Sequence, residues 1–391
     1  MCHNKLFQPF STVACRRIAL LGKRMYAPIP MVPGPVTIPA SVREALARDY
    51  PSGQIDGDYF ALLRSTERLL AGLMGTTNQI VLMSGEGMLA LWAGLKSVLT
   101  PANRVMVVST GVFGDGIADM ARGLGCSVET YALGCDRTIG EKDLEALVEM
   151  ARRHQPHLLC AVHCETPSGT LNPLELLGRI KEDCHIPLFY ADVVSSLGGT
   201  RVAVDDWHID LALGGSQKCL SLPPTLSFVS VSQRAWERIR EVNYQGYDAL
   251  LPFATIYEDG RCPYTPSWHG LAALYASLRD LDNEGFEAVF RRHEEVAKVC
   301  RTGLKALDIA LWPQQDALLS PTVTAARIPA PYTWPEWQQA LRKRGLVVAG
   351  SFGVMQGKVF RLGHMGSQAQ LSLVRSALAC MDEVLGRRRM V

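Results

Sequence analysis

One lysine stands in a setting where its charge needs an explanation. Lys218 follows the residues GGSQ and precedes CLSLPP, between the segments DLALGG and TLSFVSVS, and each of these is typical of a buried strand. A lysine that is buried without a partner loses several kcal/mol of hydration. Either Lys218 reaches solvent, or a chemical partner compensates its charge.

Other polar and aromatic residues lie at the ends of neighbouring apolar strands. Asp192 ends the strand IPLFYAD, Thr166 follows HLLCAVHCE, and Phe113 follows RVMVVST in the turn GVFGDG. The segment MSGEGM opens a helix with glycines, so its free N–H groups and the helix dipole would attract an anion. In open parallel sheets, ligands bind beyond the carboxyl ends of the strands. We therefore expect one rim to gather an anion site, a carboxylate, a lysine, a hydroxyl and an aromatic ring.

This set of groups suits pyridoxal phosphate. Lys218 would form an imine with the cofactor, Asp192 would keep the pyridine nitrogen protonated, the glycine turn would bind the phosphate, and Phe113 would stack on the ring. The protonated ring acts as an electron sink, while the lysine also moves the proton between substrate and cofactor. Imine formation would also explain how the lysine charge is accommodated.

The elements that must position these residues follow an alternating pattern from Leu62 onward. The stretch ALLRSTERLLAGLMG predicts a helix that stops at Gly75 and has one apolar stripe. The members of that stripe are Leu62, Thr66, Leu69, Leu70 and Leu73. The strands QIVLM, RVMVVST, HLLCAVHCE and IPLFYAD then alternate with helical stretches, which indicates a mostly parallel sheet covered on both faces.

We predict an α/β fold in which the pattern changes near residue 285. Residues 26–285 are expected to form an N-terminal arm and a large domain. Residues 286–391, with the short strands TVTAARI, LVVAG and KVFRLGHMG, are expected to form a smaller α+β domain. A long helix that begins near Leu271 would join the two.

Composition excludes several classes of protein. The 391 residues are 48% hydrophobic and 20% charged, with a formal net charge of +2. These values are ordinary for a soluble globular protein and give no reason to expect nucleic acid as a partner. No apolar run approaches the ~20 residues that a membrane helix needs, so no membrane partner is expected.

The cysteines indicate reduced thiols and no metal site. Eleven cysteines are scattered along the chain, which points to a cytoplasmic location. The segment CAVHC lacks a second matching half, and Cys160 and His163 would point to opposite faces of a strand. Residues 1–24 contain five basic residues and no acid, so residues 1–25 are predicted to be a transit peptide or the product of an upstream start codon.

The run from Asp192 through SSLGG, GSQKCL and PPTLSFVSVS resembles the signature of class V aminotransferases of fold type I, in the alanine/serine–glyoxylate branch. Similar motifs cover nearly the whole chain after Met25: PGPVTIPASVREAL, HCETPSGTLNPL, TPS at 265–267 and FRLGHMG. The resemblance implies a homodimeric, pyridoxal-phosphate-dependent aminotransferase with its active site at the subunit interface. It would move an amino group from a small amino acid, of alanine or serine type, to a small 2-oxo acid such as glyoxylate or pyruvate, in a ping-pong cycle.

The resemblance also implies a role for each matching residue around the cofactor ring. Lys218 would be the Schiff-base lysine and Asp192 the acid at the pyridine nitrogen. Phe113 would stack on the ring, and Val194 would lie behind it. Thr166 would lie near the phenolic edge of the cofactor.

Further residues are implied in binding the phosphate and the substrate. Gln217 would be a phosphate ligand, and Thr265 would reach the phosphate from the neighbouring subunit. The glycine turn would contribute the cofactor-binding residues Ser84, Gly85, Glu86 and Gly87. Arg361 would grip the substrate carboxylate, a bidentate task that suits a planar guanidinium.

Simpler structural explanations exist for four of these residues. Lys218 could be a solvated surface lysine, and Phe113 could be an ordinary core side chain. Asp192 could be the N-cap of a helix that begins with VVSS. Arg361 could form a surface ion pair. However, Arg361 lies within the apolar segment VFRLGHMG, and a buried arginine needs an anion, which favours the carboxylate role.

Glu86 departs from the family pattern, because many relatives have a neutral residue in this turn. It could point outward as an acid in the first helical turn, where the helix dipole favours it. Alternatively, it could indicate that the ligand is an unphosphorylated vitamin, because the turn SGEGMLAL resembles that of pyridoxamine–pyruvate aminotransferase. Gln217 remains available for a phosphate, and AGSFGVMQGK has no arginine where that enzyme has a second one. We therefore expect pyridoxal phosphate as the cofactor and keep the vitamin as the alternative.

Non-enzymatic roles fit the sequence less well. A cofactor-sensing transcription regulator of this fold needs an N-terminal DNA-binding domain, and the residues before PGPVTIP are too few to form one. An inactive or structural homologue would be expected to lose the lysine or the acid, and both Lys218 and Asp192 are present.

Overall fold

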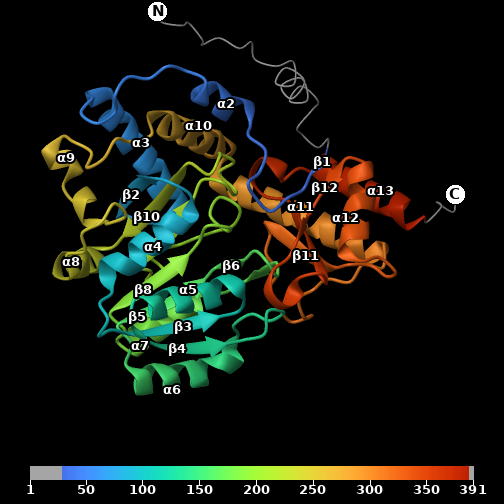
Figure 1. Ribbon diagram of the computed structural model, residues 1–391, viewed down its shortest axis with the longest axis horizontal. Helices are drawn as coiled ribbons and strands as arrows, with labels where there is room; N and C mark the ends of the chain where they lie inside the picture. Colours follow the sequence, from blue (N-terminus) through green and yellow to red (C-terminus); the bar gives the residue numbers. More distant parts are fainter. Residues whose placement is uncertain (1–28, 387–391) are drawn as a thin grey trace, which may run out of the picture.

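The computed structural model describes residues 29–386 of the chain. Figure 1 shows a large sheet with helices around it and, beside it, a smaller unit built from the C-terminal part of the chain. The predicted extension, residues 1–25, lies outside the described residues. No helix among the described residues is both long enough and apolar enough to cross a membrane.

The central sheet has seven strands among the described residues, in the order β2-β10-β9-β8-β5-β3-β4. Their bounds are β2 (Gln79–Ser84), β3 (Arg104–Ser109), β4 (Ser127–Ala132), β5 (Leu158–Val162), β8 (Leu188–Asp192), β9 (Leu211–Gly215) and β10 (Leu226–Val231). The strands from β9 to β4 pair in parallel, whereas β10 is antiparallel to both β9 and β2. The predicted mostly parallel sheet of an α/β fold is confirmed.

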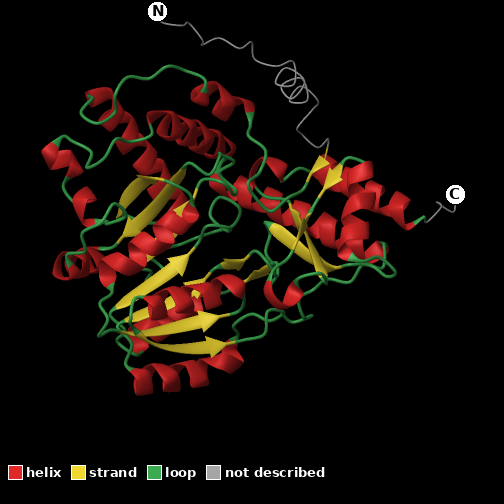
Figure 2. Ribbon diagram, in the orientation of Figure 1, coloured by secondary structure: helices red, strands yellow, loops and turns green. Residues whose placement is uncertain are grey.

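Helices cover both faces of this sheet (Figure 2). One face carries α3 (Gly57–Met74), α6 (Leu144–His154), α7 (Leu174–Asp183) and α10 (Trp268–Glu284). The other carries α4 (Gly87–Val98), α5 (Val112–Gly123) and α8 (Gln233–Val242). Because side chains alternate along a strand, Met106 and Val108 enter the first core, and Val105 and Val107 enter the second.

Helix α3 buries three members of the predicted stripe, Thr66, Leu70 and Leu73, whereas Leu62 and Leu69 are half-buried. It begins after Asp56, whose side chain accepts a hydrogen bond from the Asp58 N–H, and it ends at Met74. Gly75 then takes a left-handed conformation with φ of 59°, which a glycine adopts without strain. The predicted stop at Gly75 is confirmed.

The C-terminal unit packs helices on a small antiparallel sheet. Its helices are α11 (Phe286–Ala306), α12 (Trp334–Lys343) and α13 (Leu371–Leu385), and its strands are β11 (Val323–Arg327), β14 (Val359–Gly363) and β13 (Ala349–Gly350). The predicted strand LVVAG is split into β12 (Leu346–Val347) and β13. β1 (Ile29–Pro30) pairs with β12, and Met31 belongs to the core of this unit. The first described residues of the N-terminal arm therefore pack with the C-terminal unit.

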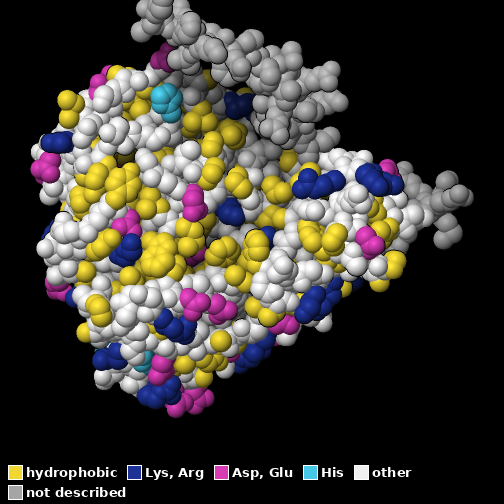
Figure 3. Space-filling model, in the orientation of Figure 1, with side chains coloured by type: hydrophobic (Ala, Val, Ile, Leu, Met, Phe, Trp, Pro, Cys, Tyr) yellow, Lys and Arg dark blue, Asp and Glu magenta, His cyan; other side chains and the backbone are white. Residues whose placement is uncertain are grey.

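Shorter elements connect these parts. They are α2 (Ala40–Leu46), α9 (Ile256–Asp259), the paired strands β6 (Cys164–Glu165) and β7 (Thr170–Leu171), and 3₁₀ turns at Glu141–Asp143, Leu251–Phe253, Gly353–Met355 and Gly366–Gln368. On the face in Figure 3, basic and acidic side chains are interspersed among apolar ones. This mixture agrees with the small net charge of +2.

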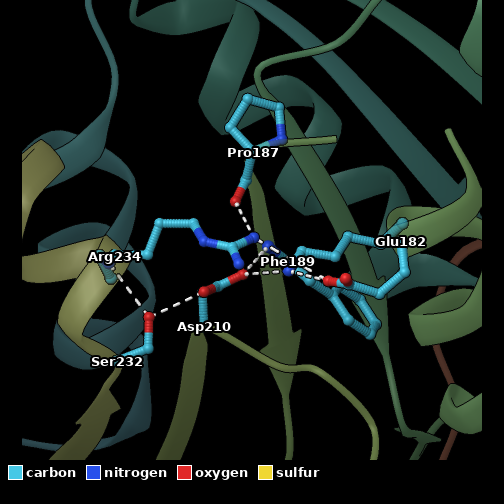
Figure 4. Close-up of polar contacts among 8 residues, drawn as sticks. Glu182, Pro187, Phe189, Asp210, Ser232 and Arg234 are labelled. Carbon is cyan, nitrogen blue, oxygen red and sulfur yellow. Dashed lines mark hydrogen bonds and ion pairs between the residues drawn. The ribbon is translucent and has the colours of Figure 1, made fainter. Parts of the chain in front are cut away.

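A partly buried ion cluster joins the amino ends of β8 and β9 to α7 (Figure 4). Lys181 Nζ lies 2.7 Å from Glu182 Oε1 and 3.3 Å from Asp210 Oδ2. Asp210 also accepts hydrogen bonds from the Phe189 N–H at 2.9 Å and the Ser232 hydroxyl at 2.7 Å. Every charge in the cluster thus has a partner, and the cluster ties neighbouring elements together at this rim.

Candidate active site

A cavity of about 530 Å³ opens beyond the carboxyl ends of β5, β8 and β9. Most of the predicted site residues line it: Glu86, Gly87, Phe113, Thr166, Asp192, Val194, Gln217, Lys218 and Arg361. Ser84 and Thr265 instead line a second cavity of the same chain, next to α3 and α10. The structure thus brings nine of the predicted site residues to a single cavity and leaves three, Ser84, Gly85 and Thr265, outside its lining.

Lys218 projects into this cavity from the loop between β9 and β10. Its Nζ donates a hydrogen bond to the Pro33 carbonyl oxygen at 2.6 Å. Gly34 has φ of +85°, and a Cβ there would lie 2.6 Å from Lys218 Cδ, so the close approach requires glycine. Burial, with a further contribution from Arg361, lowers the pKa of Lys218. A lower pKa makes more of the neutral amine, which is the nucleophilic form.

The loop that carries Lys218 is held to the strands on either side. The Ser216 N–H donates to the Leu226 carbonyl oxygen at 3.0 Å, and the Leu222 N–H donates to the Ser216 carbonyl oxygen at 3.0 Å. The Ser216 hydroxyl also donates to the Pro223 carbonyl oxygen at 2.7 Å. The backbone on both sides of the lysine is therefore fixed.

Asp192 ends β8 and is 5% exposed. Its one side-chain hydrogen bond within residues 29–386 comes from the Val194 N–H, at 2.8 Å. Burial raises the pKa of the Asp192 carboxyl to about 6, although the Val194 N–H and Lys218 oppose this shift. A cation facing the carboxylate, such as a protonated ring nitrogen, would stabilise its charge. No helix begins between β8 and β9, so the helix N-cap explanation for Asp192 is wrong.

Ser195 is a cavity residue that the sequence pattern did not single out. It lies just after Asp192 and Val194, and its hydroxyl shares a hydrogen bond with the Thr166 hydroxyl. Both hydroxyl groups are buried. The sequence signal that could have identified Ser195 is its position in VVSSLGG, the segment that directly follows Asp192. Together the two hydroxyls form a polar edge beside the carboxylate.

The glycine turn presents free backbone donors, though not all of those expected. The Gly85 N–H is already used, because it donates to the carbonyl oxygen of Thr225, just before β10, at 2.9 Å. The N–H groups of Glu86, Gly87 and Met88 at the start of α4 have no hydrogen-bond partner within the described part of the chain. These three groups and the positive end of the helix dipole could bind an anion, and this place is called the anion site below.

Glu86 faces the cavity. Its Oε2 accepts a hydrogen bond from Gln217 Nε2 at 3.1 Å. Gln217 is 8% exposed, so its amide N–H needs a nearby acceptor, and its Oε1 is buried with no partner within residues 29–386. The outward orientation considered from the sequence is wrong for this reason. A carboxylate therefore lies beside the anion site.

Arg361 on β14 is 5% exposed and lies close to no carboxylate of the described chain. Its Nε donates to the Gly350 carbonyl oxygen at 2.7 Å and one terminal nitrogen to the Thr166 carbonyl oxygen at 3.4 Å. Its guanidinium carbon lies 4.8 Å from the ring centroid of Phe352, another cavity residue that sequence reasoning missed. Burial lowers the pKa of Arg361 to about 10. The surface ion-pair explanation is therefore wrong, and the guanidinium is placed to receive an anion.

These groups fit pyridoxal phosphate on chemical grounds. A lysine with a lowered pKa, a buried carboxylate that lacks a cation, free N–H groups at a helix start and an aromatic ring surround one cavity. Glu86 is the one member of the set that opposes a phosphate. Among the described residues, no three His, Cys, Asp or Glu side chains lie where they could hold a metal ion.

Comparisons with known proteins agree with this geometry. A family model described as Aminotransferase class-V matches residues 54–375. An uncharacterized aminotransferase of Methanocaldococcus jannaschii is 34% identical over 361 residues, which is 91% of this chain and 92% of that protein. A pyridoxamine–pyruvate transaminase of Mesorhizobium japonicum is 32% identical and covers 79% of each chain. The crystal structure of an alanine–glyoxylate aminotransferase from Nostoc sp. has a TM-score of 0.88, with 26% identity, and covers 96% of this chain and all of its own.

Proposed function

The chain belongs to the class V aminotransferase family, and from that premise we propose that it moves an amino group from a small amino acid, of alanine or serine type, to a small 2-oxo acid such as glyoxylate or pyruvate. It is a pyridoxal-phosphate-dependent enzyme of fold type I. The observation that carries the choice of substrates is Arg361, a buried arginine without a carboxylate partner among the described residues, in the same cavity as Lys218 and Asp192.

The residues of the cavity divide the work of transamination. Bound pyridoxal phosphate supplies an electron sink for the electron pair left at the substrate α-carbon when its proton is removed. Lys218 would hold the cofactor through Nζ, and its amine would move the proton at the substrate α-carbon. Asp192 keeps the ring nitrogen protonated. Arg361 orients the substrate through its carboxylate.

The remaining residues orient the cofactor. Phe113 would cover one face of its ring and Val194 the other. Thr166, with Ser195, would bind the phenolic edge. Gln217 and the N–H groups of Glu86, Gly87 and Met88 would bind the phosphate.

We infer that two copies of the chain form a homodimer with the active site at their interface. Thr265 and Ser84 lie outside the Lys218 cavity of their own chain, which supports a role for Thr265 at the phosphate of a second copy. Tyr247 lines the same second cavity and is 62% exposed, as expected of a residue that a second copy would cover. Equilibrium sedimentation tests the dimer, and a monomer with full activity would contradict it.

Two further proposals concern the organisation and location of the chain. We propose a division into an N-terminal arm and large domain, residues 26–285, and a small domain, residues 286–391, with the boundary between α10 and α11. We also propose a cytoplasmic location, because the cysteines of the described residues are all free.

A half-reaction screen tests the main proposal. The purified holoenzyme is mixed with single amino acids, and the visible absorbance of the lysine-bound cofactor is followed. Alanine or serine should bleach it within seconds, and aspartate should do so more slowly, because Arg361 provides one carboxylate site only. Lys218→Ala is the matched control. If no small amino acid bleached the absorbance, the proposed function would be wrong.

One observation favours a second candidate, an aminotransferase that converts free pyridoxamine and pyruvate to pyridoxal and alanine. Glu86 lies at the anion site and bonds to Gln217, the residue expected to hold a phosphate. One relative, at 32% identity, is a pyridoxamine–pyruvate transaminase. Cofactor-free protein given pyridoxamine and pyruvate distinguishes the two candidates. If the protein performs multiple turnovers without any phosphate ester, and Glu86→Gln impairs them, the second candidate is correct and the main proposal is wrong. Under the main proposal, Glu86→Gln keeps or strengthens the preference for pyridoxal phosphate over pyridoxal.

A further inference from the structure

Glu165 is a fully buried carboxylate beside the cavity, and the roles given above do not use it. It is 0% exposed and forms β6 with Cys164, directly before Thr166. Its Oε1 accepts a hydrogen bond from the Gly114 N–H at 2.8 Å, and its Oε2 accepts one from the Phe113 N–H at 3.2 Å. Both donors belong to the first turn of α5. The carboxylate therefore serves a helix whose second residue, Phe113, lies 52 residues before it in the sequence.

Helix α5 lacks a cap from its own sequence. Gly111 occupies the N-cap position and has no side chain to accept a hydrogen bond. A Cβ at Gly111 would lie 2.8 Å from Glu165 Cδ, so the absence of a side chain there is what lets the carboxylate approach. The N–H groups of a first helical turn need acceptors, and a negative charge suits that end of the helix dipole. Glu165 supplies both from another element.

Three other helices have a cap from their own sequence: α3 has the half-buried Asp56, and α8 and α10 have serines. Ser232 caps α8 by accepting from the Ala235 N–H, and Ser267 caps α10 by accepting from the Gly270 N–H. Such hydroxyl caps carry no charge. Burial raises the pKa of Glu165 to about 7, so the protein bears a cost at α5 that a serine cap would avoid. The difference points to a role for the carboxylate beyond holding the helix together.

The position of Glu165 suggests that role. Phe113, whose N–H donates a hydrogen bond to Glu165, is the second residue of α5, and its side chain lines the cavity. Thr166, the next residue along the chain, lines the same cavity. One carboxylate thus fixes the ring and the hydroxyl relative to each other. We propose that Glu165 is a positioning residue, which caps α5 and thereby holds the Phe113 ring against the face of the bound cofactor; this inference rests on the proposed function.

A double-mutant cycle tests the proposal. Glu165→Gln keeps the shape of the side chain but turns one acceptor into an amide donor that faces a backbone N–H. It should weaken the visible circular dichroism of the bound cofactor and lower kcat roughly tenfold, because small errors in position slow a reaction strongly, with little change in KM. Phe113→Leu should lower kcat as well. Glu165→Gln added to Phe113→Leu should then change kcat less than about twofold, because the ring through which Glu165 acts is absent.

Two further variants guard against loss of folding. Gly111→Ala pushes on the Glu165 carboxyl from the helix side and should reproduce the change in circular dichroism. Asp143→Asn is the matched control, because Asp143 is 4% exposed and accepts the Gly140 N–H at 2.9 Å but does not line the cavity. It should lower the melting temperature and leave the dichroism and kcat unchanged.

The outcomes separate the inference from the proposed function. If Glu165→Gln slowed the enzyme equally with and without the Phe113 ring, Glu165 would not act through Phe113 and the inference would fail alone. If Phe113→Leu left both the dichroism and kcat unchanged, the stacking role of Phe113 and the inference would fail together. If the wild-type protein bound no pyridoxal phosphate, the proposed function itself would fall.

Discussion

The two rims of the central sheet each contain a lysine and a buried aspartate, in opposite arrangements; Lys181 is buried and Lys218 is half-buried. At the amino-end rim, Lys181 and Asp210 form an ion pair at 3.3 Å. At the carboxyl-end rim, Lys218 donates to a backbone carbonyl and Asp192 accepts from a backbone N–H, and the two form no ion pair. The first rim uses the charges to connect elements. The second leaves the charges of Lys218 and Asp192 unpaired, so that they can interact with a bound ligand.

This difference between the two rims can be explained by the free energy of burying a charge. A buried charge that loses its partner destabilises a protein strongly, whereas a well-paired one is close to neutral. The pKa of Lys218 is lowered by burial and that of Asp192 is raised to about 6 by burial, so both groups resist their charged forms. Functional sites often carry such strain. Identical residue types therefore indicate structure at one rim and chemistry at the other.

Removing Lys218 should give the largest effect. Lys218→Ala should lower transamination by on the order of 10⁴-fold or more, because it removes both the covalent link and the base. The melting temperature of the cofactor-free protein should stay the same or rise, because burial already disfavours the lysine charge. Steady-state rates and thermal melts check both. A residual rate within tenfold of wild type would show that another group performs the chemistry.

The reverse pattern is expected at the other rim. Lys181→Met should lower the free energy of unfolding by about 3 to 5 kcal/mol, because Asp210 is left buried without its cation. Turnover per folded molecule should not change. Urea denaturation and activity assays measure the two quantities. Adding Asp210→Asn should recover part of the lost stability, and no recovery would mean that packing rather than charge explains the loss.

The aspartate of the carboxyl-end rim should matter for turnover and little for binding. Asp192→Asn should retain the cofactor but slow turnover by on the order of a hundredfold or more, because an amide cannot hold the ring nitrogen protonated by charge. Absorbance reports cofactor content, and rapid mixing with alanine reports turnover. Near-normal rates in this variant would contradict the electron-sink role.

The unpaired arginine gives a smaller expected effect. Arg361→Lys preserves the charge but removes the paired donors, so kcat/KM for the amino acid should fall by an amount equivalent to roughly 1.5 to 3 kcal/mol. The fall should come mainly from weaker substrate binding. If the variant lost its cofactor while its remaining sites worked normally, Arg361 would belong to the phosphate site or to the fold.

The pH dependence of the cofactor-free protein sharpens the comparison. Burial raises the pKa of Asp192 from its usual 3.8 to about 6, so between these values the folded protein binds more protons than the unfolded chain. Stability should therefore fall as the pH rises from 4 to 6 and level off above, by roughly 1 to 3 kcal/mol. Asp192→Asn should remove this part of the pH dependence. Parallel curves for the two proteins would show that the aspartate is not strained.

The sequence was sufficient for the features that depend on local pattern. The helix that ends at Gly75, the apolar strands and the placement of Asp192 and Lys218 at strand ends followed from periodicity and from the binding rule for parallel sheets. These features need no knowledge of distant contacts. The same reasoning placed Arg361 inside a strand. Its burial there without a carboxylate partner among the described residues favours a role in binding the substrate carboxylate.

The rest depended on contacts between distant parts of the chain. Glu86 faces the cavity because Gln217, more than a hundred residues later, supplies a donor. Glu165 caps α5 from β6, and β1 joins the C-terminal unit through β12. The Gly85 N–H is unavailable to a ligand because Thr225 accepts it. No periodicity or motif encodes such pairings, so single-sequence reasoning had no signal for them.

The fixed loop around Lys218 has a consequence for the speed of its motions. Ser216 ties the loop to β10 and to Pro223, so the backbone of the lysine cannot swing between cofactor and substrate. The amine must travel by rotation about the single bonds of its own side chain. Such rotations take picoseconds to nanoseconds, whereas loop and domain movements take microseconds to milliseconds. If Lys218 has its proposed role, the rotation of its side chain is therefore too fast to limit the catalytic cycle.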